Sequence, residues 1–103
     1  ISGVGGSGDQ SGTDNDCQNL NIWTPGVNDG QARPVMVWLH GGGFSTGSAN
    51  EAGYDGENLS REGDVVVVSV NHRLNTFGFL DLSDYGDKYQ YSANVGMMDI
   101  VDA

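Results

Sequence analysis

Apolar residues along this chain fall into a few short runs, separated by long polar and glycine-rich stretches. In residues 17–23, Leu20 and Ile22 alternate with polar neighbours, which is typical of a half-buried strand. Residues 35–39 are continuously apolar and predict a second strand. Because the turn-rich residues 27–33 connect the two runs, we expect neighbouring antiparallel strands.

The third apolar run, residues 65–70, consists of five valines and one serine. Such a β-branched run without alternation predicts a strand buried on both faces, as in α/β sheets. The polar segment before it contains a short helical turn predicted at residues 57–61, and residues 71–86 show no periodicity and predict irregular structure. The order of elements therefore indicates an α/β fold.

The last ten residues, 94–103, predict the first turns of a helix. Asn94 is a suitable N-cap residue for this helix. Met97, Ile100 and Val101 fall on one side of it at helical spacing, so we expect that side to be the apolar face.

The domain organisation is simple and looks incomplete. Residues 1–16 are rich in Gly, Ser and Asp without periodicity and predict a loop or disordered lead-in, and residues 17–103 form one partial domain. The chain begins with Ile1 rather than Met, and a helix begins close to its last residue. We therefore expect a chain truncated at both ends, with few apolar segments for a core of its own.

Charge excludes two classes of partner. The 103 residues include 14 acidic and 4 basic ones, for a formal net charge of −10, which repels nucleic-acid phosphates and anionic membrane surfaces. The acidic residues are scattered through loops, which is typical of a solubilising surface. No apolar run approaches the roughly 18 residues of a membrane span. The sequence leaves the oligomeric state open.

Cysteine and histidine are too sparse for a metal site. Cys17 is the single cysteine, so no disulfide forms within the chain, and together with His40 and His72 it gives no ligand spacing of the kind that zinc sites show. We predict neither a structural metal nor a cofactor.

The strongest chemical signal follows the second strand, in the sequence His40-Gly41-Gly42-Gly43-Phe44. Consecutive glycines leave no Cβ to shield the backbone, so successive N–H groups can turn toward one point and hold a developing negative charge. Acyl-transfer enzymes require such an oxyanion hole. An ordinary flexible loop after a strand is the alternative on the glycines alone.

Two other glycine motifs lack the structural context that they need. Residues 3–8 satisfy the G-x-G-x-x-G spacing of dinucleotide sites, but no strand precedes them and no helix follows. Residues 43–47 fit the G-x-S-x-G nucleophile elbow, with Ser45 as the nucleophile. An elbow lies between a strand and a helix, whereas the strand here ends by His40 and a poor helix sequence follows. We therefore do not expect Ser45 to be the nucleophile.

The histidines, three aspartates and a glycosylation sequon have ordinary explanations. His40 or His72 can be considered as a general base, but no Ser/His/Asp order places all three groups on plausible strand ends, so we interpret His40 as a brace for the glycine loop. The sequon at residues 58–60 matters only in a secreted eukaryotic protein. Three aspartates lack the calcium-loop pattern and are interpreted as solvated loop residues, namely Asp81, Asp84 and Asp87.

Several motifs together resemble the type-B carboxylesterases, the cholinesterase-like branch of the α/β-hydrolases. They occur in the right order at residues 16–25 (DCQNLNIWTP), 34–44 (PVMVWLHGGGF), 54–56 (YDG), 64–74 (DVVVVSVNHRL), 77–80 (FGFL) and 94–99 (NVGMMD). The hormone-sensitive lipase branch also carries a His-Gly-Gly-Gly run, but its next strand typically leads to Tyr-Arg-Leu-Ala-Pro. The sequence here is NHRLN at residues 71–75, followed by FGF at 77–79, which favours the type-B branch. The resemblance implies the N-terminal part of an α/β-hydrolase fold.

The chain departs from this family at a few positions. Asn15 stands where the family usually has an acid that pairs with an upstream arginine, so that ion pair is absent. The remaining departures are tolerable in packing terms: Gln18 for leucine, His72 for tyrosine, and Met97 and Met98 for a pair of leucines.

The resemblance also implies roles for individual residues. Gly42 and Gly43 would donate backbone N–H groups to the oxyanion, and Gly41 would allow the turn. Arg73 and Asp99 would form a structural ion pair. Cys17 would form a disulfide with a cysteine upstream of Ile1.

The function implied by the resemblance is that of a serine carboxylesterase acting on small-molecule carboxylic esters, with secretion expected by analogy to relatives. The nucleophilic serine, the acid and the histidine would lie beyond Ala103, so we expect these 103 residues alone to be inactive. A non-catalytic binding or adhesion protein of the same fold is the rival hypothesis, and the glycine loop favours the enzyme. A third hypothesis is a free-standing acidic domain. Its central strand would be exposed, which argues against it.

Overall fold

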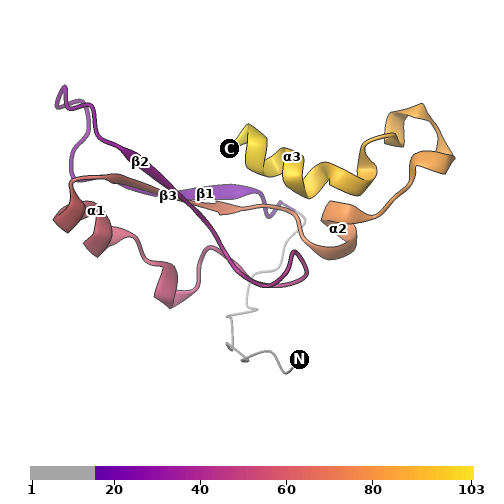
Figure 1. Cartoon of the computed structure of the whole chain (residues 1–103), viewed down its shortest axis with the longest axis horizontal. Coiled ribbons are helices and arrows are strands. Elements are labelled where there is room, and N and C mark those ends of the chain that lie inside the picture. Colours follow the sequence, from indigo (N-terminus) through magenta and orange to yellow (C-terminus); the bar gives the residue numbers. More distant parts are fainter. Residues whose placement is uncertain (1–15) are drawn as a thin grey trace.

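A three-stranded mixed sheet organises the part of the chain that the computed structural model describes, residues 16–103. Its helices and strands are β1 (Asn19–Trp23), β2 (Val35–Leu39), α1 (Glu57–Gly63), β3 (Val66–Asn71), α2 (Asn75–Phe79) and α3 (Val95–Asp102) (Figure 1). Short 3-10 turns lie at Ala52–Tyr54, Ser83–Tyr85, Asp87–Tyr89 and Ser92–Asn94. Apart from Asp16, the predicted lead-in lies outside the described residues, and so do the glycine spacing at 3–8 and Asn15.

The strand order is β1-β3-β2, with β3 in the centre. β1 pairs antiparallel with β3, so that Leu20 lies opposite Val70. β2 pairs parallel with β3, so that Val35 lies opposite Val66. The prediction that the first two strands are neighbours is therefore wrong. The parallel pair is possible because the segment containing α1 is long enough to return the chain to the other end of the sheet.

Burial is concentrated on the central strand. Val67 and Ser69 are buried on one face of β3 and Val70 on the other, which confirms the prediction from the valine run. Every residue of β2 is exposed, in contrast; Val35 retains 61% and Trp38 46% of its accessible surface. A central strand with two partners is covered on both edges, whereas β2 has only β3 beside it within the described residues.

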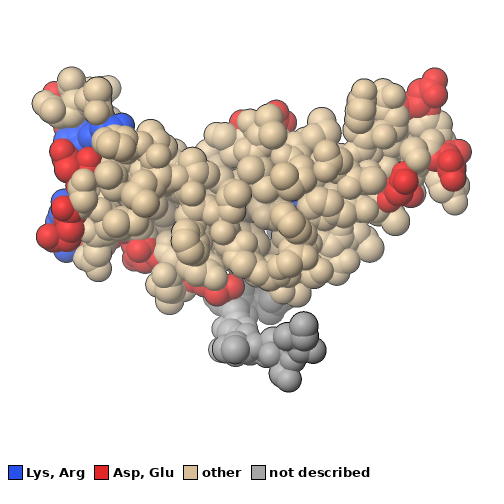
Figure 2. Space-filling view, in the orientation of Figure 1, with Lys and Arg blue, Asp and Glu red and all other residues tan. Residues whose placement is uncertain are grey.

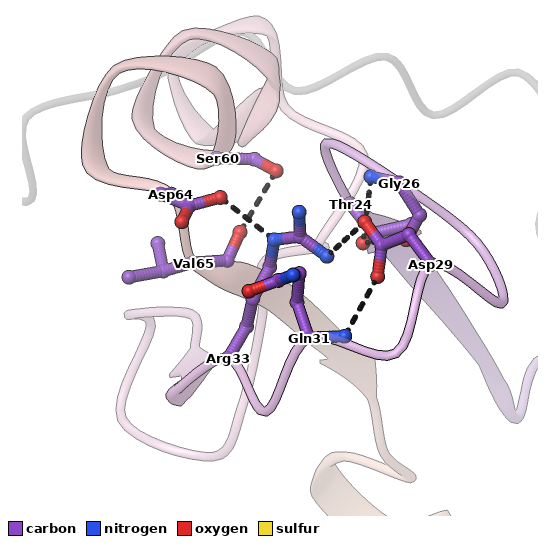
Figure 3. Close-up of polar contacts among 8 residues, drawn as sticks. All are labelled: Thr24, Gly26, Asp29, Gln31, Arg33, Ser60, Asp64 and Val65. Carbon is purple, nitrogen blue, oxygen red and sulfur yellow. Dashed lines mark hydrogen bonds and ion pairs between the residues drawn. The ribbon is translucent and has the colours of Figure 1, made fainter.

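Arg33 ties together two turns at the amino ends of β2 and β3 (Figure 3). Its guanidinium lies 2.7 Å from a carboxylate oxygen of Asp29 in the β1–β2 loop. A second contact of 2.7 Å reaches Asp64, which ends α1 in a left-handed conformation with φ of 50°. A backbone hydrogen bond from Gln31, followed by the contact with Arg33, lowers the pKa of Asp29. These contacts fix the start of the parallel pair, at the end of the sheet opposite the glycine loop.

α2 and α3 pack together beyond the carboxyl end of β3 (Figure 1). The prediction of irregular structure over residues 71–86 is wrong for α2 and for the 3-10 turn at Ser83–Tyr85. Gly78 of α2 and Gly96 of α3 both lie against the backbone carbonyl of Arg73, where a Cβ atom would stand only 2.5 and 2.6 Å from its oxygen. Glycine at both positions therefore permits the close packing of the two helices.

α3 exists where the sequence predicts it, but another face is buried. Asn94 occupies the N-cap position without a capping hydrogen bond from its side chain. The buried residues are Gly96 and Asp99, whereas Val101 is 82% exposed. The apolar side of α3 is therefore not its buried side, because a close helix contact and an ion pair, rather than apolar spacing, orient this helix.

Charged side chains on the face drawn in Figure 2 gather mainly at the two ends of the molecule. One end carries the β1–β2 loop and α1, and the other carries the 3-10 turns before α3. Among residues 16–103, no helix has the length and apolar character needed to cross a membrane.

Candidate functional site

The glycine loop leaves the carboxyl end of β2, beside the carboxyl end of β3. Both strands run in the same direction, so His40 and His72, each just beyond a strand, meet at one edge of the sheet. In open α/β sheets this edge is where ligands bind. The chemistry predicted from the glycines therefore lies where the topology favours a site.

The loop backbone favours glycine at two of its three glycine positions, most strongly at Gly42. Gly42 has φ of 120° and Gly43 has φ of 61°, and Phe44 continues the left-handed stretch at 60°. A Cβ on Gly42 would also overlap the carbonyl oxygen of Thr46. Gly41 has no positive φ, and no heavy atom lies within 4 Å of the position that its Cβ would take. The conformational demand thus falls on Gly42 and Gly43 rather than on Gly41.

The N–H groups of Gly42 and Gly43 have no acceptor among the described residues. Their neighbours are engaged through carbonyl groups instead. The Gly41 carbonyl oxygen lies 2.8 Å from Nδ1 of His40. The Gly42 carbonyl accepts the N–H groups of Ser45 and Thr46 at 3.1 and 3.3 Å. Successive backbone N–H groups without partners are the kind of donor that an anion-binding loop uses.

A cluster of four rings, those of His40, Phe44, His72 and Phe79, supports the glycine loop. The rings of His40 and His72 are stacked, with centroids 5.0 Å apart and planes within 8°. Phe44 packs against His72 and, edge to face, against Phe79 of α2 at 5.9 and 5.3 Å between centroids. His72 is buried, with only 5% of its surface accessible to solvent. The loop therefore rests on β3 and α2 rather than standing free.

Ser45, His40 and His72 do not contact one another through hydrogen bonds within residues 16–103. Ser45 sits in a turn with neither a strand before it nor a helix after it, and its hydroxyl contacts the Gly43 carbonyl at 3.4 Å. Nδ1 of His40 contacts the Gly41 carbonyl, and Nδ1 of His72 contacts the Arg73 carbonyl at 3.0 Å. Neither ring contacts a serine or a carboxylate in the described part of the chain, so a base with its nucleophile is not formed here.

The structure brings Arg73 and Asp99 together in an ion pair beneath the site. Nη2 of Arg73 lies 2.6 Å from the Asp99 carboxylate, and the Arg73 backbone N–H donates to the same carboxylate at 2.8 Å. Burial alone would raise the pKa of Asp99, but the hydrogen bonds from Arg73 outweigh it and hold the pKa below its usual value. Gln18 of the segment before β1 also donates to this carboxylate. One buried acid thus joins three segments of the chain.

The other singled-out residues lie apart from the glycine loop. Cys17 is exposed and free. Asp81 accepts the backbone N–H of Ser83 at 2.9 Å, and no group of three potential metal ligands forms among residues 16–103. In the sequon, Ser60 is 3% exposed and its hydroxyl donates to the Val65 carbonyl, so the sequon is part of helix α1 rather than a loop.

Sequence reasoning missed three residues that shape the loop. Gly47 has φ of 105°, and a Cβ there would stand 2.7 Å from Nδ1 of His40. The Asn71 side chain accepts the Ala49 N–H at 2.8 Å and so anchors the segment after the loop. Asn75 donates its N–H to the Phe44 carbonyl. The sequence places Gly47 at the end of an elbow motif, although a glycine after a turn is itself a signal of positive φ.

Comparison with known proteins identifies the class and then the family. The closely similar solved structures are α/β-hydrolase esterases. One, described as an esterase from anaerobic Clostridium hathewayi that can hydrolyze aliphatic aromatic polyesters, superposes with a TM-score of 0.82 at 57% identity, over 85% of this chain and 18% of that one. The described residues thus form part of an α/β-hydrolase fold.

A sequence profile described as "Carboxylesterase family" matches residues 3–103, and the chain belongs to that family. Phenmedipham hydrolase of Pseudarthrobacter oxydans is 47% identical over 87% of this chain and 17% of its own length. Para-nitrobenzyl esterase of Bacillus subtilis is 44% identical over 82% of this chain, again 17% of its own length. The chain therefore spans about a sixth of the length of these relatives.

Proposed function

We propose that these residues are the N-terminal part of a serine carboxylesterase and supply its oxyanion hole. The observation that carries the proposal is the pair of backbone N–H groups at Gly42 and Gly43, which have no acceptor in the described part of the chain. They lie at the carboxyl edge of the parallel strands, in a loop whose positive φ angles favour glycine. Membership of the carboxylesterase family supports the same chemistry.

In the reaction, a histidine deprotonates the nucleophilic serine, and the serine oxygen attacks the ester carbonyl. The carbonyl oxygen becomes an oxyanion, which accepts the Gly42 and Gly43 N–H groups. Collapse of the tetrahedral intermediate expels the alcohol and leaves an acyl-enzyme, which water hydrolyses to the acid. Serine, histidine and acid come from residues beyond Ala103, so we propose that the 103 residues alone are inactive.

The remaining parts of the proposal follow the family. The substrates are small carboxylic esters, since the family of this chain is that of the carboxylesterases. No cofactor takes part, because serine esterase chemistry needs none. The protein is secreted, and the exposed Cys17 forms a disulfide with a cysteine upstream of Ile1.

The test uses the full-length protein with Gly43→Val, a change that disturbs the N–H donor and its access. Gly30→Val is the matched control, because Gly30 has φ of 74°, close to the 61° of Gly43, and neither position has an atom within 4 Å of an added Cβ. Loss of one oxyanion donor costs about 3 kcal/mol, so kcat should fall by a few hundredfold in Gly43→Val only. Equal kcat in the two variants would contradict the proposal. A wild-type protein without esterase activity would favour the adhesion hypothesis.

A further inference from the structure

The orientation of each oxyanion donor is set by the carbonyl group of the same peptide unit. All peptide bonds in the described chain are trans, so the N–H of Gly42 points opposite to the C=O of Gly41. In the same way, the N–H of Gly43 points opposite to the C=O of Gly42. Whatever holds these two carbonyl oxygens therefore aims the two donors.

The two carbonyls are held in different ways. The Gly42 carbonyl accepts two backbone N–H groups from the following turn, those of Ser45 and Thr46. The Gly41 carbonyl is held by a side chain, Nδ1 of His40, at 2.8 Å. A carbonyl oxygen only accepts, so Nδ1 carries the proton of the ring. The direction of the Gly42 N–H thus depends on one imidazole.

The His40 ring is itself fixed on both sides. His72 stacks under it at 5.0 Å, and Gly47 lies so close to Nδ1 that an added Cβ would stand at 2.7 Å. Nε2 of His40 is buried and has no hydrogen-bond partner within residues 16–103. This geometry is unsuited to a proton-transfer role for His40, because Nδ1 is occupied and Nε2 is covered.

We propose that His40 is a positioning residue that aims the Gly42 N–H at the oxyanion through the Gly41 carbonyl, and that His72 fixes the His40 ring by stacking. The inference rests on the proposed oxyanion role of Gly42. It assigns to His72, the histidine that replaces the expected tyrosine, a part in the site although it touches no substrate. It also explains why Gly47 must lack a side chain.

Two substitutions at His40 separate hydrogen bonding from ring packing. His40→Phe keeps a ring on His72 but loses the donor to Gly41. His40→Asn loses the ring but places an amide N–H near the position of Nδ1. At position 72, His72→Phe keeps a ring for stacking and His72→Ala removes it.

The experiment measures hydrolysis of 4-nitrophenyl acetate and inhibition by phenylboronic acid, whose adduct with the nucleophilic serine is a tetrahedral anion, with full-length variants. A displaced donor costs on the order of a hundredfold, so His40→Phe should lower kcat about 100-fold with KM within about threefold, and weaken phenylboronic acid binding in parallel. His40→Asn should recover at least about tenfold of the kcat loss. His72→Ala should lower kcat more than His72→Phe.

Wild-type kcat in His40→Phe, or equal loss in His40→Phe and His40→Asn, would overturn the inference. Should His40→Phe fail to fold, His40→Asn decides, because the inference requires it to retain at least about a tenth of wild-type kcat. Gly43→Val distinguishes failure of the His40 role from failure of the oxyanion hole. If Gly43→Val loses activity while His40→Phe does not, only the positioning role of His40 fails; if Gly43→Val is unaffected, the proposed oxyanion hole fails.

Discussion

The backbone N–H of Asn75 donates to the carbonyl oxygen of Phe44 at 2.7 Å, and both residues have left-handed backbone conformations, with φ of 52° and 60°. This bond joins the end of the glycine loop to the first residue of α2. The Phe44 ring reinforces the junction by packing on Phe79 of the same helix. The loop and α2 therefore form one unit, although α1 and β3 lie between them in sequence.

Substitution at Asn75 should show the cost of this conformation. Asn75→Val places a β-branched residue at positive φ, so we expect a loss of about 1–2 kcal/mol in the free energy of unfolding of the full-length protein. Asn75→Gly keeps the N–H and relieves the strain, so its stability should equal or exceed that of wild type. Urea denaturation compares the two. Equal stability of the valine and glycine variants would show that the φ of 52° is not a constraint.

Gly96→Ala should destabilise the packing of α3. The added Cβ would stand 2.6 Å from the Arg73 carbonyl oxygen and 2.7 Å from the Phe79 ring. Overpacking of this kind costs about 1–3 kcal/mol, which thermal unfolding detects as a lower Tm. Gly53→Ala is the control, because no atom lies within 4 Å of a Cβ there. A normal Tm in Gly96→Ala would contradict the close contact.

Acidification should weaken the Arg73–Asp99 pair. Hydrogen bonds from Arg73 lower the pKa of Asp99 in the folded state against the effect of burial. Unfolded Asp has a pKa of about 3.9, so the contribution of this group to stability is fully present above about pH 4 and is lost as pH falls through the lowered folded pKa.

Asp99→Asn tests this dependence. The variant should lose about 1–3 kcal/mol at pH 7, because Arg73 loses its charged acceptor, and its stability should fall less than that of wild type between pH 5 and pH 3. Urea denaturation across that range gives both quantities. Asp84→Asn, at an exposed residue outside the ion pairs of the described chain, should keep the wild-type profile. An unchanged profile in Asp99→Asn would assign the acid sensitivity to other groups.

Covalent labelling should locate the nucleophile outside these residues. Ser45 contacts only a backbone carbonyl through its hydroxyl, and no histidine activates it. An organophosphate that inactivates the full-length esterase should therefore modify a serine absent from the 103 residues, as identified by mass spectrometry of tryptic peptides. An adduct on Ser45 would contradict this prediction, because it would identify Ser45 as the nucleophile of a G-x-S-x-G elbow.

Local patterns in the sequence predict the positions of the strands well, because each apolar run coincides with a strand. They do not predict burial equally well: the run at residues 65–70 becomes the buried β3, whereas the run at residues 35–39 becomes the exposed β2. Strand order is not local, so the sequence does not show that β3 separates β1 from β2. α2 is a five-residue helix, NTFGF, with a glycine and too few residues for a periodic signal. Its existence depends on packing against α3, which no local pattern reports.

The features of the site likewise divide into those that a local sequence pattern shows and those that depend on contacts between distant residues. The glycine run is contiguous, so its capacity for anion binding is visible in the sequence. The stacking of His40 on His72 and the anchoring of the loop by Asn75 join residues far apart in the chain. The buried face of α3 follows from Gly96 and Asp99, a glycine contact and an ion pair that an apolar periodicity cannot identify.

The central position of β3 also sets a temporal order on the ribosome. Within residues 16–103, β1 and β2 are synthesised before β3, the central strand with which both pair. Among the described strands, a hairpin between β1 and β2 is the structure that competes with this order before β3 is present. The native order excludes such a hairpin, so the placement of the loop that carries Gly42 and Gly43 depends on β3 inserting between β1 and β2.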